Sequence, residues 1–337
     1  INKKIKMKII AELAQGFEGD LTKAKLLVNA AASSGADIAK LQLVYADELA
    51  TPEYLHYKLF KGLELPDSSW RELLDYSNEL SIELNFDIFG TRSLNLCQDL
   101  GIKGIKLHGT DTTNIGLLNE VSQSNIKNVY LGIGGSNLKE IELAISILKN
   151  KNIILLLGFQ SYPTPNNDNQ ISRVSYLKDY LLKKYNNIEI GFADHPDPNS
   201  SLGFALAATA VGSGATIIEK HLTLGKIMKM EDHESALNPD EFEGFTKTIR
   251  NCFLALGNTV DSDDFGMSNS EKSYRKMIRR HVTSSKDLKK GTVLNSKNLV
   301  LKRTAAENVI YDISLVYGKK LTKDLEINKA LNQNIIK

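Results

Sequence analysis

The first 257 residues alternate short apolar runs with longer amphipathic stretches. One run, residues 153–157, reads Ile-Ile-Leu-Leu-Leu without a polar side chain. Strands of a parallel sheet have such sequences, because helices cover both faces of the sheet and bury every side chain. We therefore expect eight parallel strands, at residues 8–14, 38–43, 82–89, 104–107, 129–133, 153–158, 188–192 and 216–220.

A helix is expected after each of these strands. The first begins after Asp20, a favourable N-cap residue, and ends before Gly35. The expected helices are residues 21–33, 68–80, 92–100, 114–124, 137–148, 172–185, 200–212 and 240–256. Eight such units predict an α/β fold, a closed (β/α)₈ TIM barrel. A doubly wound open sheet is the alternative, although no G-x-G-x-x-G motif opens the first helix.

The pattern changes after residue 257. Residues 258–275 are polar and predict a linker, and residues 276–337 predict a small C-terminal domain with short strands at 280–284 and 298–302. The net charge of +2 gives no reason to expect a nucleic acid or an anionic membrane as partner. Two cysteines without a metal-binding spacing agree with a reduced, cytoplasmic setting.

Polar side chains gather at the ends of the predicted strands, where barrel enzymes have their active sites. His195 and His221 follow the last two strands. Imidazoles are common ligands of divalent metals, so this pair predicts a metal site with open positions for water and substrate. A single histidine at such a position is more often an ordinary loop or core residue.

Charged residues also lie inside the strands. Lys40 and Lys106 are costly to bury against helices, so we expect them to point into the barrel mouth and to neutralise a phosphate or carboxylate. Glu12 and Glu219 would orient a sugar hydroxyl or transfer a proton. Buried salt bridges between these acids and lysines are the structural alternative.

Several segments resemble the sialic acid synthase family. They are Ile10-Ala11-Glu12, Lys40-Leu41-Gln42, Tyr162-Pro163-Thr164-Pro165, Gly191-Phe192-Ala193-Asp194-His195, Ile218-Glu219-Lys220-His221 and Asn238-Pro239-Asp240. The tail, with Lys289-Lys290-Gly291 and Gly318-Lys319-Lys320, resembles the antifreeze-like (SAF) domain of that family. The resemblance extends in order over nearly the whole chain.

This resemblance implies a barrel joined to an SAF domain in a domain-swapped homodimer. It implies condensation of phosphoenolpyruvate with an aldose-type sugar, such as N-acetylmannosamine, to a sialic acid-like 3-deoxy-ulosonate, with release of phosphate and with Mn²⁺ or Mg²⁺ as cofactor. His195 and His221 match the metal ligands of the family, and Lys40 and Lys106 match its phosphoenolpyruvate-binding lysines. Glu219 matches a glutamate assigned to proton transfer.

The remaining site residues are assigned to the sugar. Those that match sugar-facing positions of the family are Glu12, Gln42, Phe89, Tyr162 and Asp232. Gln160, which like Tyr162 follows the sixth predicted strand, is also expected to bind substrate. Arg303 matches the arginine that the SAF domain offers to the active site of the partner subunit.

The chain departs from the family where phosphoenolpyruvate should bind. Asp87 replaces a threonine, and Gly109, Gly132 and Ala193 replace serines. An aspartate repels a phosphate unless a metal or a lysine neutralises it. We expect His108, Thr110, Thr112 or backbone N–H groups near Gly132 to compensate. Two other functions stay open: a non-catalytic sugar-binding homologue and a metal-dependent aldolase.

Overall fold

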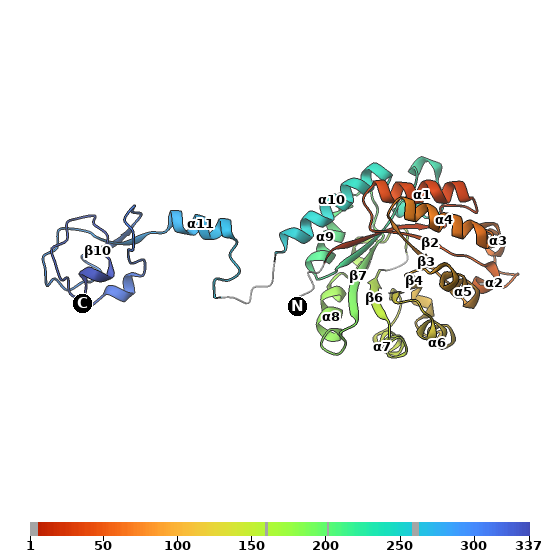
Figure 1. Ribbon diagram of the computed structural model, residues 1–337, viewed down its shortest axis with the longest axis horizontal. Helices are drawn as coiled ribbons and strands as arrows, with labels where there is room; N and C mark the ends of the chain where they lie inside the picture. Colours follow the sequence, from red (N-terminus) through yellow and green to blue (C-terminus); the bar gives the residue numbers. More distant parts are fainter. Residues whose placement is uncertain (1–5, 159–160, 201, 258–262) are drawn as a thin grey trace. The chain divides into compact units, whose positions relative to one another are not determined.

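The chain forms two compact units, Ile1–Gly257 and Asn258–Lys337, in a computed structural model (Figure 1). The structure describes residues 6–158, 161–200, 202–257 and 263–337. Each unit has its own hydrophobic core. We describe each unit by itself.

The N-terminal unit is a closed barrel in which the strands pair in sequence order and the eighth pairs with the first. The strands are β1 (Lys8–Ala14), β2 (Ile38–Gln42), β3 (Glu83–Asp87), β4 (Gly104–Leu107), β5 (Asn128–Gly132), β6 (Asn152–Leu157), β7 (Ile188–Asp194) and β8 (Ile217–His221). All eight pairings are parallel. The predicted TIM barrel is confirmed, and the open sheet is wrong.

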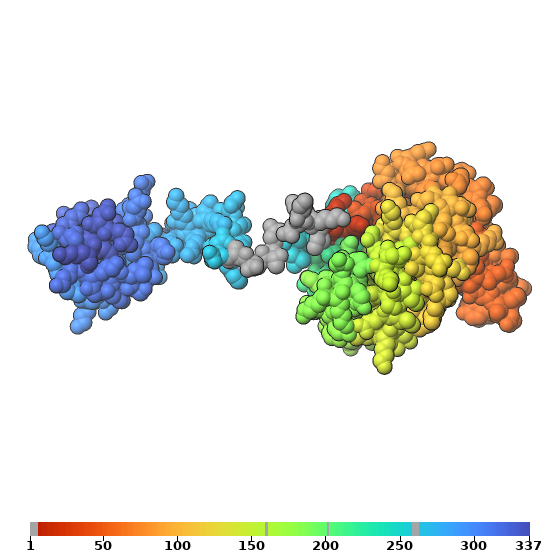
Figure 2. Space-filling view, turned by 60° about the horizontal axis from the view of Figure 1, so that its bottom comes forward, coloured from red at the N-terminus to blue at the C-terminus, as the bar shows by residue number. Residues whose placement is uncertain are grey.

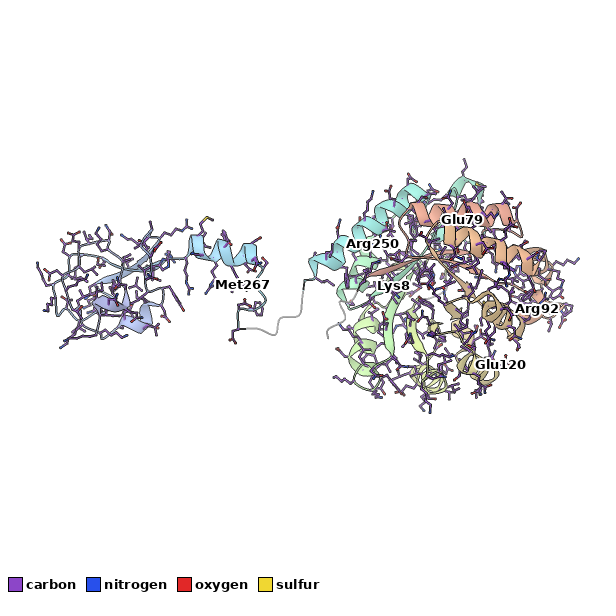
Figure 3. All side chains as sticks on the ribbon, in the orientation of Figure 1. Lys8, Glu79, Arg92, Glu120, Arg250 and Met267 are labelled. Atoms are coloured by element: carbon purple, nitrogen blue, oxygen red, sulfur yellow. The ribbon has the colours of Figure 1, made fainter. Side chains whose placement is uncertain are left out.

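Helices surround the barrel (Figure 1). Those that were predicted are α1 (Leu21–Ser33), α4 (Asp67–Glu79), α5 (Thr91–Leu100), α6 (Ile115–Gln123), α7 (Leu138–Ile147), α8 (Ser172–Leu181), α9 (Ala205–Gly212) and α10 (Pro239–Ala255). Long charged side chains such as Arg92 and Glu120 lie on their outer faces (Figure 3). No helix among the described residues is long and apolar enough to span a membrane.

Two short helices between β2 and α4 were not predicted, α2 (Ala46–Leu49) and α3 (Tyr57–Leu63). This segment protrudes from the barrel unit as a lobe, orange in Figure 2. It carries exposed apolar side chains, among them Leu55 at 85% exposure. With apolar residues on its outer side, the segment lacks the amphipathic pattern from which a helix is recognised.

The barrel has an apolar interior below its mouth. Six buried side chains form this cluster, which we call the floor: Ile10, Ile38, Tyr130, Ile154, Leu156 and Ile217. A second, larger core lies between strands and helices, where Trp70 packs edge-on against Phe17 and Phe86. Because side chains alternate along a strand, residues two positions after a floor residue also point inward.

The C-terminal unit contains α11 (Asn269–Ile278) and an antiparallel pair, β9 (His281–Ser284) and β10 (Leu299–Lys302). Its core includes Val282, Leu294 and Val316, each fully buried. Part of the segment predicted as a linker, residues 258–275, is therefore helical. The assignment of residues 276–337 as an SAF domain stays a prediction.

The N-cap of α1 gives a direct test of the local folding argument. The Asp20 carboxylate accepts hydrogen bonds from the backbone N–H groups of Thr22 at 2.7 Å and Lys23 at 3.1 Å. We expect Asp20→Ala to lower the free energy of unfolding by ~1 kcal/mol in chemical denaturation. Asp20→Asn, which keeps an accepting oxygen, should cost much less, and equal losses for the two variants would contradict the capping role.

Candidate active site

A layer of charged side chains lies on top of the floor. Glu12, Lys40 and Glu219 come two residues after the floor residues of β1, β2 and β8. Asp87 and Lys106 are register partners on β3 and β4. Five charged groups from five strands therefore meet inside the barrel mouth, and each residue is less than 10% exposed.

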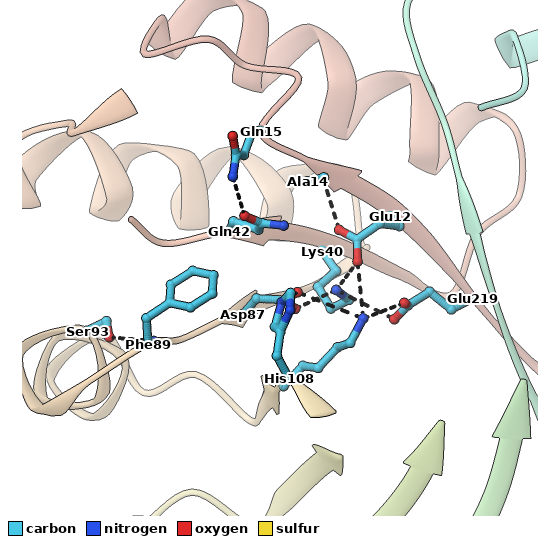
Figure 4. A network of polar contacts seen from close by, with 11 residues as sticks. Glu12, Ala14, Gln15, Lys40, Gln42, Asp87, Phe89, Ser93, His108 and Glu219 are labelled. Atoms are coloured by element: carbon cyan, nitrogen blue, oxygen red, sulfur yellow. Dashed lines mark hydrogen bonds and ion pairs between the residues drawn. The ribbon is translucent and has the colours of Figure 1, made fainter. Parts of the chain in front are cut away.

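These five side chains form one network of ion pairs (Figure 4). The Lys40 ammonium contacts the carboxylates of Glu12 and Asp87, and lies 3.5 Å from Glu219 Oε2. Lys106 Nζ lies 2.5 Å from Glu219 Oε1 and 3.6 Å from Glu12 Oε2. These residues form the buried salt bridges of the structural alternative and also face the mouth, and their roles toward a substrate stay predictions.

Three carboxylates share two ammonium groups. Because there are more acids than lysines, the pKa values of the three carboxyl groups differ. Burial raises the pKa of Glu12 to about 7, because the attraction of Lys40 does not offset it and Asp87 and Glu219 repel its charge. The lysines outweigh burial at the other two acids and lower the pKa of Asp87 and Glu219. Glu12 is therefore the member of the network that carries a proton near neutral pH.

A histidine extends the network towards the opening. His108, directly after β4, has its Nε2 atom 2.9 Å from Asp87 Oδ2. Its ring lies 5.2 Å from the ring of Phe89, centroid to centroid. The Asp87 carboxylate thus contacts Lys40 on one oxygen and His108 on the other.

The two histidines of the predicted metal site lie on the neighbouring wall. His195 and His221 are each 4% exposed, with ring centroids 5.3 Å apart. Tyr162 packs against both rings at 5.0 and 5.3 Å. Burial, together with the charge of His195, holds the pKa of His221 well below its usual range. A neutral imidazole keeps the lone pair that a metal ligand needs.

The charged network and the histidine pair line a single pocket. Its lining residues are Glu12, Gln42, Asp87, Lys106, His108, Gly109, Gly132, Gly134, Leu156, Gly158, Tyr162, Ala193, His195, Glu219 and His221. Lys40 lies just beneath this surface and is fully buried. The pocket opens at the carboxyl ends of the strands, where the sequence predicted the site.

The other predicted residues have varied positions. Gln42 lines the pocket and accepts a hydrogen bond from Gln15 at 2.7 Å, and Phe89 lies beside His108. Asp232 has a left-handed backbone, and burial raises the pKa of its carboxyl to about 6. Their roles in binding stay predictions.

Two predicted residues are not part of the described pocket. Gln160 lies outside the described residues. Arg303 is exposed in the C-terminal unit, where it donates to the Ile278 carbonyl oxygen at 3.2 Å. The homodimer that would bring it to the active site of a partner subunit stays a prediction.

Comparison with known proteins decides the family. The model of the NeuB family matches residues 27–261. The chain belongs to the NeuB family. This membership confirms the resemblance to the sialic acid synthases that the sequence motifs indicated.

Similar members of the NeuB family are named as synthases. The chain is 29% identical to the N,N'-diacetyllegionaminic acid synthase of Campylobacter jejuni, over 96% of this chain and 98% of that protein. It is 25% identical to the human N-acetylneuraminate-9-phosphate synthase, over 97% and 92%. The N-acetylneuraminic acid synthetase structure from Leptospira borgpetersenii is 29% identical, with a TM-score of 0.72 over 80% of this chain and 92% of that one. These names confirm the prediction of a sialic acid synthase-like enzyme.

The wall formed by β4, β5 and β6 lacks side chains where the sequence showed departures from the family. Gly109, Gly132, Gly134 and Gly158 line it. Of the expected compensating residues, Thr112 donates to the Gly109 carbonyl oxygen at 2.9 Å, and Thr110 is exposed. Sequence reasoning noted Asp87 and His108 separately but missed their contact, because the pairing depends on where β3 and β4 end in the barrel.

We call this surface, lined by Gly109, Gly132, Gly134 and Gly158, the glycine wall. Its packing predicts what happens when a serine of the family is restored. A Cβ atom at Gly109 would lie 2.5 Å from the backbone oxygen of Gly134, which cannot move as a flexible side chain could. Gly109→Ser should therefore destabilise the barrel by ~1–3 kcal/mol and lower activity. Gly116→Ser is the control, since a Cβ there meets only Asn114 Oδ1 at 3.8 Å. A Gly109→Ser protein as stable and active as the control would show that the wall is not tightly packed.

The raised pKa of Glu12 predicts a pH effect on stability. The folded protein holds this proton up to about pH 7, whereas an ordinary glutamate loses it near 4.5. The folded state binds more protons in this window, so the free energy of unfolding should fall as the pH rises from 5 to 8, by up to roughly 3 kcal/mol from this group.

Glu12→Gln should remove that contribution. The quantity to measure is the difference between wild type and variant in urea denaturation at several pH values, because the histidines contribute to both curves alike. Glu79→Gln, at an exposed glutamate of α4, is the matched control. A pH-independent difference between wild type and Glu12→Gln would contradict the assignment.

Proposed function

We propose that this protein condenses phosphoenolpyruvate with the open-chain aldehyde form of an aldose-type sugar, such as N-acetylmannosamine or a related sugar. The product would be a sialic acid-like 3-deoxy-ulosonate, released together with phosphate. The observation that carries the proposal is one pocket of a NeuB-family barrel that is lined by Lys106, two glutamates and a histidine pair. Lys40 lies directly beneath this pocket and contacts Glu12.

The histidine pair fits a divalent cation, Mn²⁺ or Mg²⁺, as cofactor. His195 and His221 are buried, adjacent, and follow neighbouring strands. Among the described residues no set of three or more His, Cys, Asp or Glu side chains is grouped as a metal cage. A cation held by two imidazoles keeps positions open for water and substrate, as a catalytic site requires. When bound, it would polarise the aldehyde of the sugar as a Lewis acid.

An ion pair behind the two histidines supports their arrangement. Lys220 and Asp194, each next to one of the histidines in sequence, point to the helix side of the barrel and are fully buried. Lys220 Nζ lies 3.0 Å from Asp194 Oδ2 and 3.3 Å from the Asp194 carbonyl oxygen. This pair joins the ends of β7 and β8 and so fixes the spacing of the two imidazoles.

The charged network would then serve the reaction of phosphoenolpyruvate. Lys106 and Lys40 offset the negative charge of phosphoenolpyruvate as its C3 atom forms a bond to the aldehyde carbon. Glu12, whose pKa is about 7, donates a proton to the aldehyde oxygen. Glu219, whose pKa is lowered, accepts a proton from the water that adds to C2. Two carboxyls with pKa values pushed apart suit these opposite tasks.

Cleavage of the bond between C2 and the phosphate oxygen completes the reaction. The hydroxyl proton on C2 leaves with the phosphate, and the carbonyl of the product forms. Transfer of the proton from Glu219 to Glu12 restores the starting state, and Lys106 contacts both carboxylates.

The proposal is tested by incubation with phosphoenolpyruvate, Mn²⁺ and a panel of aldoses, with phosphate release and product mass as the measurements. We expect turnover with at least one N-acetylated sugar. His221→Ala should lower the rate by on the order of 100-fold or more and weaken Mn²⁺ binding in calorimetry. His56→Ala, at an exposed histidine before α3, should leave both unchanged.

The results also separate the alternatives. Absence of phosphate release with every sugar would refute the condensation. Phosphoenolpyruvate or sugar binding without turnover would then indicate a non-catalytic homologue. Metal binding without phosphoenolpyruvate binding would indicate an aldolase on the same barrel.

A further inference from the structure

The positive charges of the two pocket lysines are already engaged by acids of the chain itself. Lys40 contacts Glu12 and Asp87, and Lys106 contacts Glu219. Three carboxylates therefore face two ammonium groups in the same buried layer. A phosphate brings further negative charge into this buried region, and an additional cationic donor would offset it.

The glycine wall cannot supply that donor from its own side chains. A Cβ atom at Gly109 would lie 2.5 Å from the Gly134 oxygen, and one at Gly158 would lie 2.6 Å from the Ala193 oxygen. The backbone is therefore too close-packed there for hydroxyl side chains at these two positions. Apart from the backbone N–H groups, a donor for a ligand at this wall has to come from a neighbouring residue.

Besides Lys106, His108 is a pocket residue next to this wall whose side chain can carry a positive charge. It precedes Gly109 and lines the same pocket as Gly132 and Gly134, with 15% of its side chain exposed. Its Nε2 atom faces the Asp87 carboxylate at 2.9 Å, and its ring packs on Phe89. The charge of Lys40 lowers the pKa of Asp87, so Asp87 is an acceptor and His108 Nε2 carries a hydrogen.

We propose that His108, oriented by Asp87, binds the phosphate group of the substrate as an imidazolium, in place of the hydroxyls that the chain lacks. A carboxylate that accepts a hydrogen bond from one ring nitrogen fixes the direction of the imidazole ring. Asp87 then supports phosphate binding instead of opposing it, because Lys40 and His108 offset the negative charge of its carboxylate. The inference rests on the proposed function for the identity of the substrate as phosphoenolpyruvate.

Binding measurements test the inference apart from turnover. The probes are inorganic phosphate, phosphoenolpyruvate and pyruvate, which lacks the phosphate, each titrated into the full-length protein by calorimetry. We expect His108→Gln to raise the Kd for phosphate and phosphoenolpyruvate roughly tenfold or more, and the Kd for pyruvate less than about twofold. His56→Gln, the same change at an exposed histidine, should alter none of these constants.

Asp87→Asn is the second variant, since an amide oxygen or nitrogen can still contact the ring but carries no charge. We expect it to weaken phosphate binding as well, and the double variant Asp87→Asn/His108→Gln to be no weaker than the poorer single variant. Such non-additivity identifies a pair that acts as one unit. Thermal unfolding and circular dichroism identify variants that fail to fold, and His108→Gln, close to the pocket surface, then carries the test alone.

The outcomes separate this inference from the proposed function. Unchanged phosphate and phosphoenolpyruvate binding in His108→Gln, with turnover intact, overturns the role of His108 and leaves the condensation standing. Weaker phosphate binding in a protein that shows no turnover supports His108 and refutes the condensation. An equal loss of pyruvate and phosphate binding overturns the inference, because it indicates general damage to the pocket. A wild-type protein that binds neither phosphate nor phosphoenolpyruvate overturns both.

Discussion

The mouth of this barrel depends on two buried lysines that hold three carboxylates together. Without them, three acids from different strands would lie side by side in a region with almost no water. Removing one member of such a network leaves an unpaired buried charge, which typically costs ~3–5 kcal/mol. Lys40 contributes most to this balance, because it contacts Glu12 and Asp87 and lies near Glu219. The same balance leaves Glu12 with a proton and Glu219 without one, so the stability of the site and its proposed chemistry have a common origin.

The two halves of the pocket differ in character. The wall from β7 and β8 holds His195 and His221 with an ion pair behind them. The wall from β4, β5 and β6 has four glycines, Gly109, Gly132, Gly134 and Gly158, and His108 borders it. We assign the half with the two histidines to the proposed metal and the half with the glycines to the proposed phosphate. Asp87, which stands where the family has a threonine, contacts Lys40 through one carboxylate oxygen and His108 through the other.

The sequence predicted the barrel because several of its strands are continuous apolar runs that alternate with amphipathic helices, and the predicted strand bounds agree with the structure to within one or two residues. Helix α11 was not predicted because it has no buried residue. Its sequence is therefore as polar as that of a linker. Helices α2 and α3 escaped because they are short and carry exposed apolar side chains. Single inward-facing residues such as Lys106 and Glu219 were predictable from the strands that carry them. Contacts between strands, such as Asp87 with His108, depend on where each strand ends, and a single sequence does not specify that.

The floor has a consequence for how molecules enter and leave the pocket. Ile10, Tyr130, Ile154 and their neighbours fill the interior below the charged layer, so the pocket is blind at its lower end. Two molecules that react there must enter through the same opening, one after the other. The molecule that reaches the lysines has to arrive before the one that covers it, and products must leave in the reverse geometric order. For the proposed condensation, a barrel closed at its base would thereby set the order in which the two substrates bind.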